Sequence, residues 1–146
     1  MKVTVLLCDA AEVVADKLYI LGGGWSVVDA GAVRMAIAIK IEVPWDRTNQ
    51  PHSLALSLVT EDGSPVTLKN EDKAEAPVAI QGQFEVGRPP RTVPGTPIDF
   101  PLTLSVGTIP LDPGRYTWRL EIDGESDPTW EVGFTARLPA SGAAGS

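Results

Sequence analysis

The stretch that decides the fold is VRMAIAIKIEV, residues 33–43. Large apolar side chains occupy every odd position of this stretch, while the even positions hold alanine or charged residues. Side chains two residues apart lie on the same face of a β-strand, whereas a helix would scatter these apolar groups around its axis. Residues 33–43 therefore predict a strand with one face in a hydrophobic core.

The same alternation recurs along the chain and predicts further strands at residues 2–8, 17–21, 25–28, 53–59, 66–68, 78–86, 98–106, 116–122 and 130–136. Pro101 lies inside one of them, and because proline donates no hydrogen bond, it predicts a sheet edge or a bulge there. Asp9 and Glu12 have the spacing of a helix capping box, which predicts one helical turn or a tight turn ending near Asp16. Turn residues predict a hairpin turn at 61–65 and a turn at 123–124, and composition predicts irregular loops at 69–77 and 87–97.

Many short strands, no long helix and frequent turn signals indicate an all-β protein, an antiparallel Greek-key β-sandwich. The length of 146 residues suits one domain over residues 1–138. Residues 139–146 are small and give a core nothing to bury, so we expect a flexible C-terminal tail. Cys8 is the one cysteine of the chain, which excludes an internal disulfide.

Net charge and hydropathy limit the kinds of partner that we expect the chain to bind. The formal charge is −7, which repels phosphate backbones, so we expect no nucleic acid partner. No apolar run approaches the roughly 20 residues of a membrane span, and the apolar N-terminal stretch is too short for a secretory signal. We therefore expect no membrane partner and a cytoplasmic location.

One motif is specific for a fold. Asp112-x-Gly114-x-Tyr116 resembles the tyrosine corner of immunoglobulin-like domains, in which the tyrosine hydroxyl bonds back to the corner before it. The resemblance implies an immunoglobulin-like sandwich in which this corner is structural. Trp118 stands where antibody domains have a cysteine, so we expect an apolar side chain to fill the place of the missing disulfide.

Three stretches together resemble a family of small, uncharacterised bacterial proteins. They are LLCDAAEVVADKLYILGGGWSVV at residues 6–28, the central alternating strand, and PLDPGRYTWRLEIDG at residues 110–124. The resemblance spans most of the chain. It implies a small domain of unknown function and supplies no activity and no site residue.

Catalytic groups are scarce. His52 is the single histidine, and its place at the start of a strand indicates an exposed structural residue. Cys8 follows a strand and precedes Asp9, whose charge raises a thiol pKa, so we interpret it as a buried or half-buried packing residue. We therefore expect no catalytic residue, no cofactor and no zinc site, and a protein that is not an enzyme.

Two ligand classes stay open. The spacing of Asp123, Glu125 and Asp127 brings three carboxylates close in sequence and suggests calcium, with further candidates at Glu61, Asp62, Glu71 and Asp72. Common turn residues give the simpler interpretation. Four tryptophans suggest a sugar platform, for which Trp25 and Trp45 are the candidates because Trp118 and Trp130 are in phase with the core.

The interpretation we favour is an interaction or assembly module that contacts a protein partner or a second copy through its loops. The candidate loops are residues 44–52 and 87–97, with contact residues Trp45, Arg47, Arg88 and Arg91. Ala36 and Ala38 form a small, uncharged second face on the central strand, which predicts that something flat covers it. The simpler cover is the chain's own crossing at 87–97, and the alternative is another subunit. A module that binds carbohydrate or calcium is the alternative function.

Overall fold

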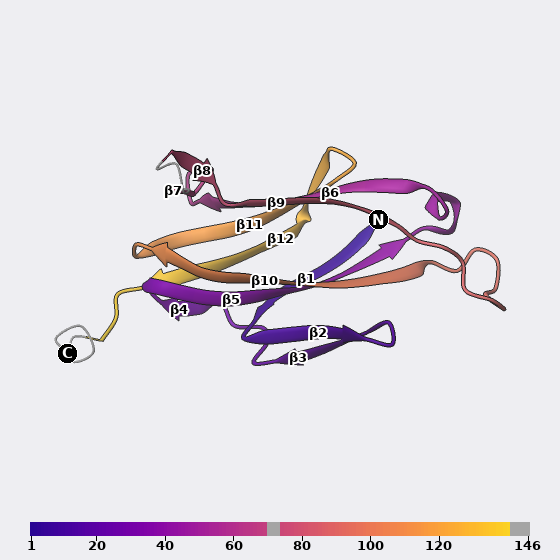
Figure 1. Cartoon of the computed structure of the whole chain (residues 1–146), viewed down its shortest axis with the longest axis horizontal. Coiled ribbons are helices and arrows are strands. Elements are labelled where there is room, and N and C mark those ends of the chain that lie inside the picture. Colours follow the sequence, from indigo (N-terminus) through magenta and orange to yellow (C-terminus); the bar gives the residue numbers. More distant parts are fainter. Residues whose placement is uncertain (70–73, 141–146) are drawn as a thin grey trace.

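The computed structural model describes residues 1–69 and 74–140, and it contains two packed sheets with a hairpin beneath them (Figure 1). Apart from one 3₁₀ turn, η1, every regular element of these residues is a strand. In chain order the elements are β1 (Lys2–Cys8), β2 (Ala10–Val14), β3 (Lys17–Leu21), β4 (Val27–Asp29), β5 (Gly31–Val43), η1 (Trp45–Arg47), β6 (Pro51–Thr60), β7 (Thr67–Lys69), β8 (Glu75–Pro77), β9 (Ala79–Glu85), β10 (Ile98–Leu111), β11 (Gly114–Ile122) and β12 (Glu125–Arg137).

The first sheet is built around β5, which contains the stretch of residues 33–43. Its order is β1-β5-β10, and both pairings are antiparallel. The six apolar residues at odd positions of this stretch are at most 4% exposed, which confirms the predicted core face. Because β5 has a strand on each side and a packed core against it, its backbone and its apolar side chains are both satisfied.

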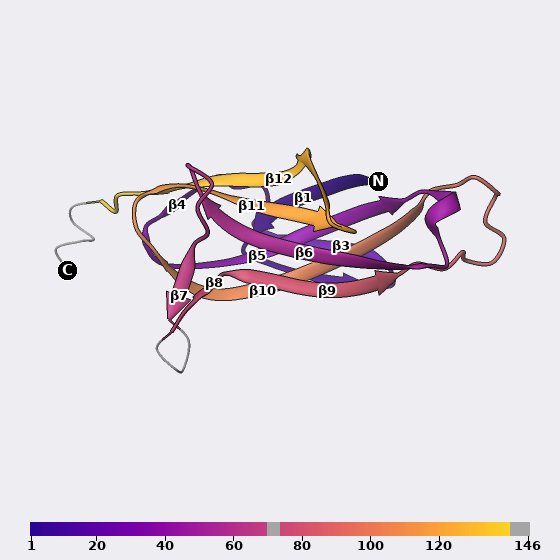
Figure 2. The same ribbon diagram turned by 90° about the horizontal axis from the view of Figure 1, so that it is seen from above.

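The second sheet lies over the first, in the order β4-β12-β11-β6-β9 (Figure 2). Its neighbours are antiparallel except β4 and β12, which run parallel, so the expected antiparallel β-sandwich is confirmed with one short exception. Trp118 of β11 is fully buried between the sheets, and its Nε1 donates to Sδ of Met35 at 3.2 Å. An apolar side chain therefore does fill the core at Trp118, as expected.

Of the two alternatives expected after Asp9, the helical turn is wrong, while a tight turn is present at Ala15 and Asp16. Residues 10–21 form the β2–β3 hairpin instead, and Asp9 N–H donates to the carbonyl of Leu21 at 3.0 Å rather than to a helix. The two turn residues, Ala15 and Asp16, have φ of 50° and 61°, the left-handed values of a type I′ hairpin turn. The capping spacing misled because Val13 and Val14 favour extended backbone, and because Ala-Asp is an unusual pair for this turn.

The β2–β3 hairpin is a third layer that covers the second face of the β5 sheet (Figure 1). Ala36, Ala38 and Cys8 are buried beneath it, with Ala11 and Leu18 of the hairpin packed against them. The cover predicted over the two alanines is thus intramolecular. It comes from the hairpin and not from residues 87–97, because the start of that loop is bonded to residues 44–52 at one end of the sandwich.

Three smaller predictions can also be compared with the structure. Residues 87–97 form an irregular loop, as predicted, whereas the predicted loop at 69–77 includes β8, which pairs with β7. Pro101 lies in β10, an edge strand, and the bulge of that strand falls between Ser105 and Gly107. The tail prediction for residues 141–146 lies outside the described residues. Within the described ranges, no helix has the length and apolar character needed to cross a bilayer.

Candidate functional site: a loop cluster and a hairpin face

The two loops predicted to contact a partner meet at one end of the sandwich, at the right in Figure 2. The guanidinium of Arg88 lies 3.8 Å from the centre of the Trp45 ring, close enough for a cation–π contact. Arg88 Nε also donates to Thr48 Oγ1 and its Nη2 donates to the Trp45 carbonyl, both at 2.7 Å. One face of Trp45 is therefore covered by the chain itself.

His52 is the buried centre of this end, which corrects the expectation that it is exposed. It is 2% exposed, its Nδ1 lies 2.7 Å from Asp123 Oδ2, and its Nε2 lies 2.8 Å from the Arg47 carbonyl. Both neighbours are acceptors, so a neutral imidazole donates to one of them while a protonated imidazole donates to both. With both nitrogens occupied within the fold, the expected structural role of His52 stands.

The Asp123 carboxylate accepts hydrogen bonds from several donors around it. It accepts from His52, from the backbone N–H of Ser53 at 2.9 Å and from Arg47 Nη2 at 2.8 Å. The hydrogen bond from His52 is the main reason that the pKa of Asp123 is lowered, with Ser53 and the charges of His52 and Arg47 adding to it. We call Trp45, Arg47, Thr48, His52, Arg88 and Asp123 the loop cluster.

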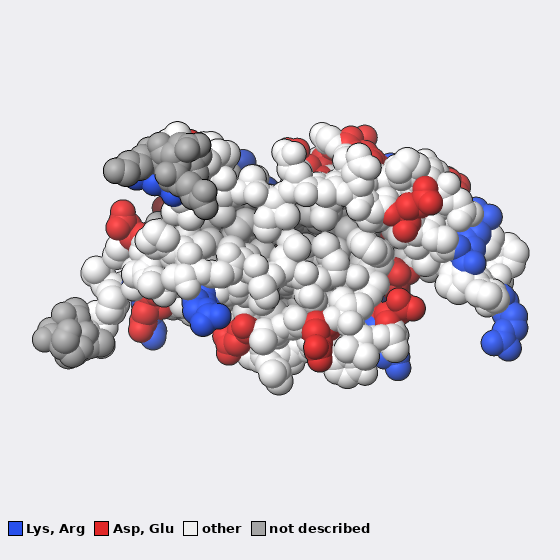
Figure 3. All heavy atoms as spheres, viewed as in Figure 1, with Lys and Arg blue, Asp and Glu red and all other residues white. Residues whose placement is uncertain are grey.

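The loop cluster changes how the four predicted contact residues are interpreted. Trp45, Arg47 and Arg88 are engaged with each other's loops or with Asp123, whereas Arg91 is exposed and makes no ion pair within the described residues. Figure 3 shows basic groups at this end of a molecule whose surface carries many acidic ones. Contact of these four residues with a partner stays a prediction.

A sequence pattern could have found His52. Leu54, Leu56 and Leu58 alternate inward on β6, and the same step of two places His52 inward as well. Its ring packs 5.3 Å from the ring of Phe84, at the end of the core. Asp123 was beyond such a pattern because it lies 71 residues from His52 and reaches it only through the β6–β11 pairing.

The carboxylates suggested for calcium do not gather into a metal site within the described residues. Asp123 is turned toward His52, and Asp127 Oδ1 accepts from the backbone and hydroxyl of Thr129, which lowers its pKa. Asp62 is likewise held by Thr60 and Ser64, whose hydrogen bonds lower its pKa. Within the described part of the chain, no three His, Cys, Asp or Glu side chains gather as metal ligands do. Glu71 and Asp72 lie outside the described residues.

The tryptophans have separate surroundings. Trp118 and Trp130 are buried, as predicted. Trp25 is partly exposed and packs edge-on against Phe134, with 6.1 Å between ring centres, while its Nε1 is buried without a hydrogen-bond partner among the described residues. Because Trp45 instead packs on Arg88, the two candidate rings do not pack on each other as one sugar platform.

Two other predicted residues keep structural surroundings. Cys8 is fully buried, and burial, with the adjacent Asp9 charge, raises the pKa of its thiol, which keeps it a poor nucleophile. Tyr116 Oη donates to the Asp112 carbonyl at 2.7 Å, the hydrogen bond that the Asp112-x-Gly114-x-Tyr116 spacing predicts. Burial, and the Asp112 charge after it, raises the pKa of Tyr116.

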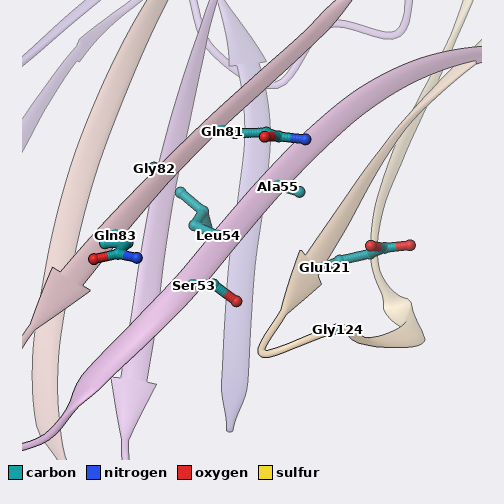
Figure 4. A pocket seen from close by; sticks show the side chains of 8 residues that line it. All are labelled: Ser53, Leu54, Ala55, Gln81, Gly82, Gln83, Glu121 and Gly124. Atoms are coloured by element: carbon teal, nitrogen blue, oxygen red, sulfur yellow. The ribbon is translucent and has the colours of Figure 1, made fainter.

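A polar hollow of about 470 Å³ lies on the outer side of the second sheet (Figure 4). Small outward residues of β6, Ser53 and Ala55, lie between taller side chains, which are Gln81 and Gln83 of β9 and Glu121 of β11. Amide, hydroxyl and carboxylate groups can bond a polar ligand. The hollow lacks the aromatic lining that most small-molecule pockets have.

The hairpin carries most of the large apolar side chains that are exposed among residues 1–69 and 74–140. Five of the eight large hydrophobic residues that are exposed in the described chain lie on β2 and β3, namely Val13, Val14, Tyr19, Ile20 and Leu21. A second hollow of about 470 Å³ lies on this hairpin and is lined by Ala10, Ala11, Glu12, Tyr19, Ile20 and Leu21. Val13 and Ile20 have the inward parity of Ala11 and Leu18, so Val14, Tyr19 and Leu21 are the exposed apolar residues of the outer side. Exposed apolar groups that gather on one side of a soluble protein mark a candidate contact surface.

Comparison with known proteins gives a family and no function. No curated protein matches this chain. A family model described as a family of unknown function (DUF6941) matches residues 3–132, nearly the whole of both sheets. The loop cluster, the hairpin and all of the sandwich except the ends of β1 and β12 therefore lie in the matched region, and the chain belongs to this family of unknown function.

Proposed function

We propose that this protein is a non-enzymatic interaction module and that the outer side of the β2–β3 hairpin is its contact surface. The observation that carries the proposal is the exposure of Tyr19 and Leu21, at 52% and 72%, on a layer whose inner side is packed on the sandwich. A two-stranded hairpin is marginal by itself, and this one is fixed to a rigid scaffold. It presents apolar side chains at little further ordering cost on binding.

The predicted contact loops fit the proposal as a second region. The loop cluster holds residues 44–52 and the base of 87–97 rigid, while Arg91 and Val93 project from the loop. An immunoglobulin-like Greek-key topology, a bacterial source and a cytoplasmic location belong to the same proposal. The Tyr116–Asp112 hydrogen bond and the unpaired, buried Cys8 support its fold and location.

A photo-crosslinking experiment tests the contact surface. The photoreactive residue p-benzoylphenylalanine replaces Leu21 in one variant and Ser57, on the outer side of β6, in a matched control. Both are irradiated in an extract of the source cells. We expect a discrete protein adduct from the Leu21 variant and none from the control. Equal labelling of both variants, or no adduct at Leu21, would contradict the proposal.

The polar hollow supports a second candidate function, a module that binds a hydroxyl-rich ligand such as a carbohydrate. Gln81, Gln83 and Glu121 surround its small floor and supply donors and acceptors. Saturation-transfer NMR against a set of oligosaccharides tests it, with a Gln81→Ala, Gln83→Ala double variant as the comparison. Transfer to a sugar that disappears in the variant would favour this candidate, and transfer that persists would exclude the hollow.

A further inference from the structure

We infer that the partner of the hairpin is a second copy of this chain, an inference that rests on the proposed function. The outward side chains follow from the register. Ala11 and Leu18 pack inward, so their neighbours of opposite parity point outward on the two strands. The outward residues form three cross-strand pairs, which we call the hairpin face: Ala10 with Leu21, Glu12 with Tyr19, and Val14 with Lys17.

Charge favours a copy of the chain over an acidic or a basic partner. The hairpin face carries one anion, Glu12, and one cation, Lys17, and neither makes an ion pair within the described residues. A partner surface that is only acidic or only basic would place a like charge against Glu12 or Lys17. A second hairpin face presents both signs, so each charge has its opposite nearby on the other copy, although the chain as a whole carries −7.

Shape points to the same arrangement. When a two-fold axis runs parallel to the strands, β2 of one copy packs over β3 of the other. Leu21 then lies over Ala10 of the second copy, so the most exposed large side chain of the hairpin meets its smallest outward one. The hollow beside Ala10 receives it. In the same arrangement Glu12 lies over Tyr19 of the other copy, and Lys17 of that copy is the next outward residue along β3.

Size predicts that the association is weak. Five-residue strands are about 17 Å long and neighbouring strands about 4.8 Å apart, so this face alone buries well below the roughly 800 Å² per partner of a standard interface. Figure 1 shows the hairpin as a narrow layer under the sandwich. We therefore expect a weak, reversible dimer.

Sedimentation equilibrium of the purified chain from about 1 µM to about 1 mM tests the inference. Wild type is expected to pass from monomer to dimer, and Glu12→Lys or Lys17→Glu alone to weaken dimerisation at least tenfold. An equimolar mixture of these two variants should regain dimers, because one face then carries two cations and the other two anions. Lys69→Glu, the same charge change at an exposed site on β7, is the matched control and should dimerise as wild type does.

The outcomes separate this inference from the proposed function. A wild type that stays monomeric to about 1 mM, or single variants that dimerise like the control, would overturn the inference. If Leu21 then still crosslinks to another protein, the interaction module stands and its partner is different. If neither dimer nor adduct appears, both proposals fail. Circular dichroism checks that the variants are folded, as their exposed positions predict.

Discussion

The loop cluster and the hairpin face are opposite kinds of surface. The loop cluster gathers an aromatic ring, two arginines, a histidine and a carboxylate, residue types that often mark binding sites, and the chain bonds them to one another. The hairpin face holds alanine, valine and leucine beside Tyr19, Glu12 and Lys17, and no other described segment covers it. Residue type alone therefore points to groups that the fold has already bonded to one another, and it does not show which groups the fold leaves unsatisfied.

This contrast predicts that substitutions in the loop cluster change stability, whereas those on the hairpin face change association. The largest stability effect is expected at His52. His52→Ala removes a buried imidazole and its contacts with the Asp123 carboxylate and the Arg47 carbonyl, and leaves both acceptors without that partner. We expect a loss of about 2–4 kcal/mol in the free energy of unfolding, measured by urea titration. Ser53→Ala is the control, because its backbone N–H still bonds Asp123, and an equal loss there would contradict the prediction.

Acid should weaken the same cluster. The pKa of Asp123 is lower in the folded chain than when unfolded, so its contribution is fully present above the unfolded value, about 4, and is lost as pH falls through the folded value. The stability difference between wild type and Asp123→Asn should therefore shrink as pH falls from about 6 to about 3. Urea titrations at several pH values measure it, and a difference independent of pH would contradict the role of the charge.

Arg88 gives an intermediate effect. Arg88→Ala removes the contact with the Trp45 ring and the hydrogen bonds to Thr48 and the Trp45 carbonyl, all near solvent. We expect a loss of about 1 kcal/mol and a change in tryptophan fluorescence as Trp45 becomes uncovered. Arg91→Ala, a neighbouring arginine without such contacts, should change neither. The dimer constant should be the same in both variants.

A substitution in the hairpin turn should raise the stability of the chain, by less than the losses predicted above. Ala15 has a φ of 50°, which an alanine side chain disfavours and asparagine tolerates better. Ala15→Asn should stabilise the chain by about 0.5 kcal/mol, because the type I′ turn then costs less strain. Thermal melting measures the gain. Ala140→Asn, outside the strands, is a control for the change in composition alone.

The smallest stability effect is expected at Leu21. It is 72% exposed, so Leu21→Ser should change the free energy of unfolding by less than about 0.5 kcal/mol while abolishing the dimer in sedimentation. A large loss of stability would mean that the residue supports the hairpin itself. An unchanged dimer would remove Leu21 from the contact.

A feature of this fold could be predicted from the sequence when it depends on neighbouring residues. Alternation in residues 33–43 and its recurrence predicted most strands, the core face of β5 and the burial of Trp118, because side-chain direction in a strand repeats every two residues. The same alternation, followed along β6, also indicates that the side chain of His52 points inward. The capping pattern at Asp9 and Glu12 failed because local spacing competes with strand pairing, and the pairing with residues 17–21 prevails.

Taken by itself, the sequence determined that this is a disulfide-free all-β chain with a core of alternating apolar residues. Tertiary structure alone decided that β2 and β3 cover Ala36 and Ala38, that Asp123 meets His52, and that the hairpin face stays open. The reason is that side-chain direction is set within a few residues. Which layer packs on which, and which groups remain unsatisfied, is set by contacts between segments far apart in the chain.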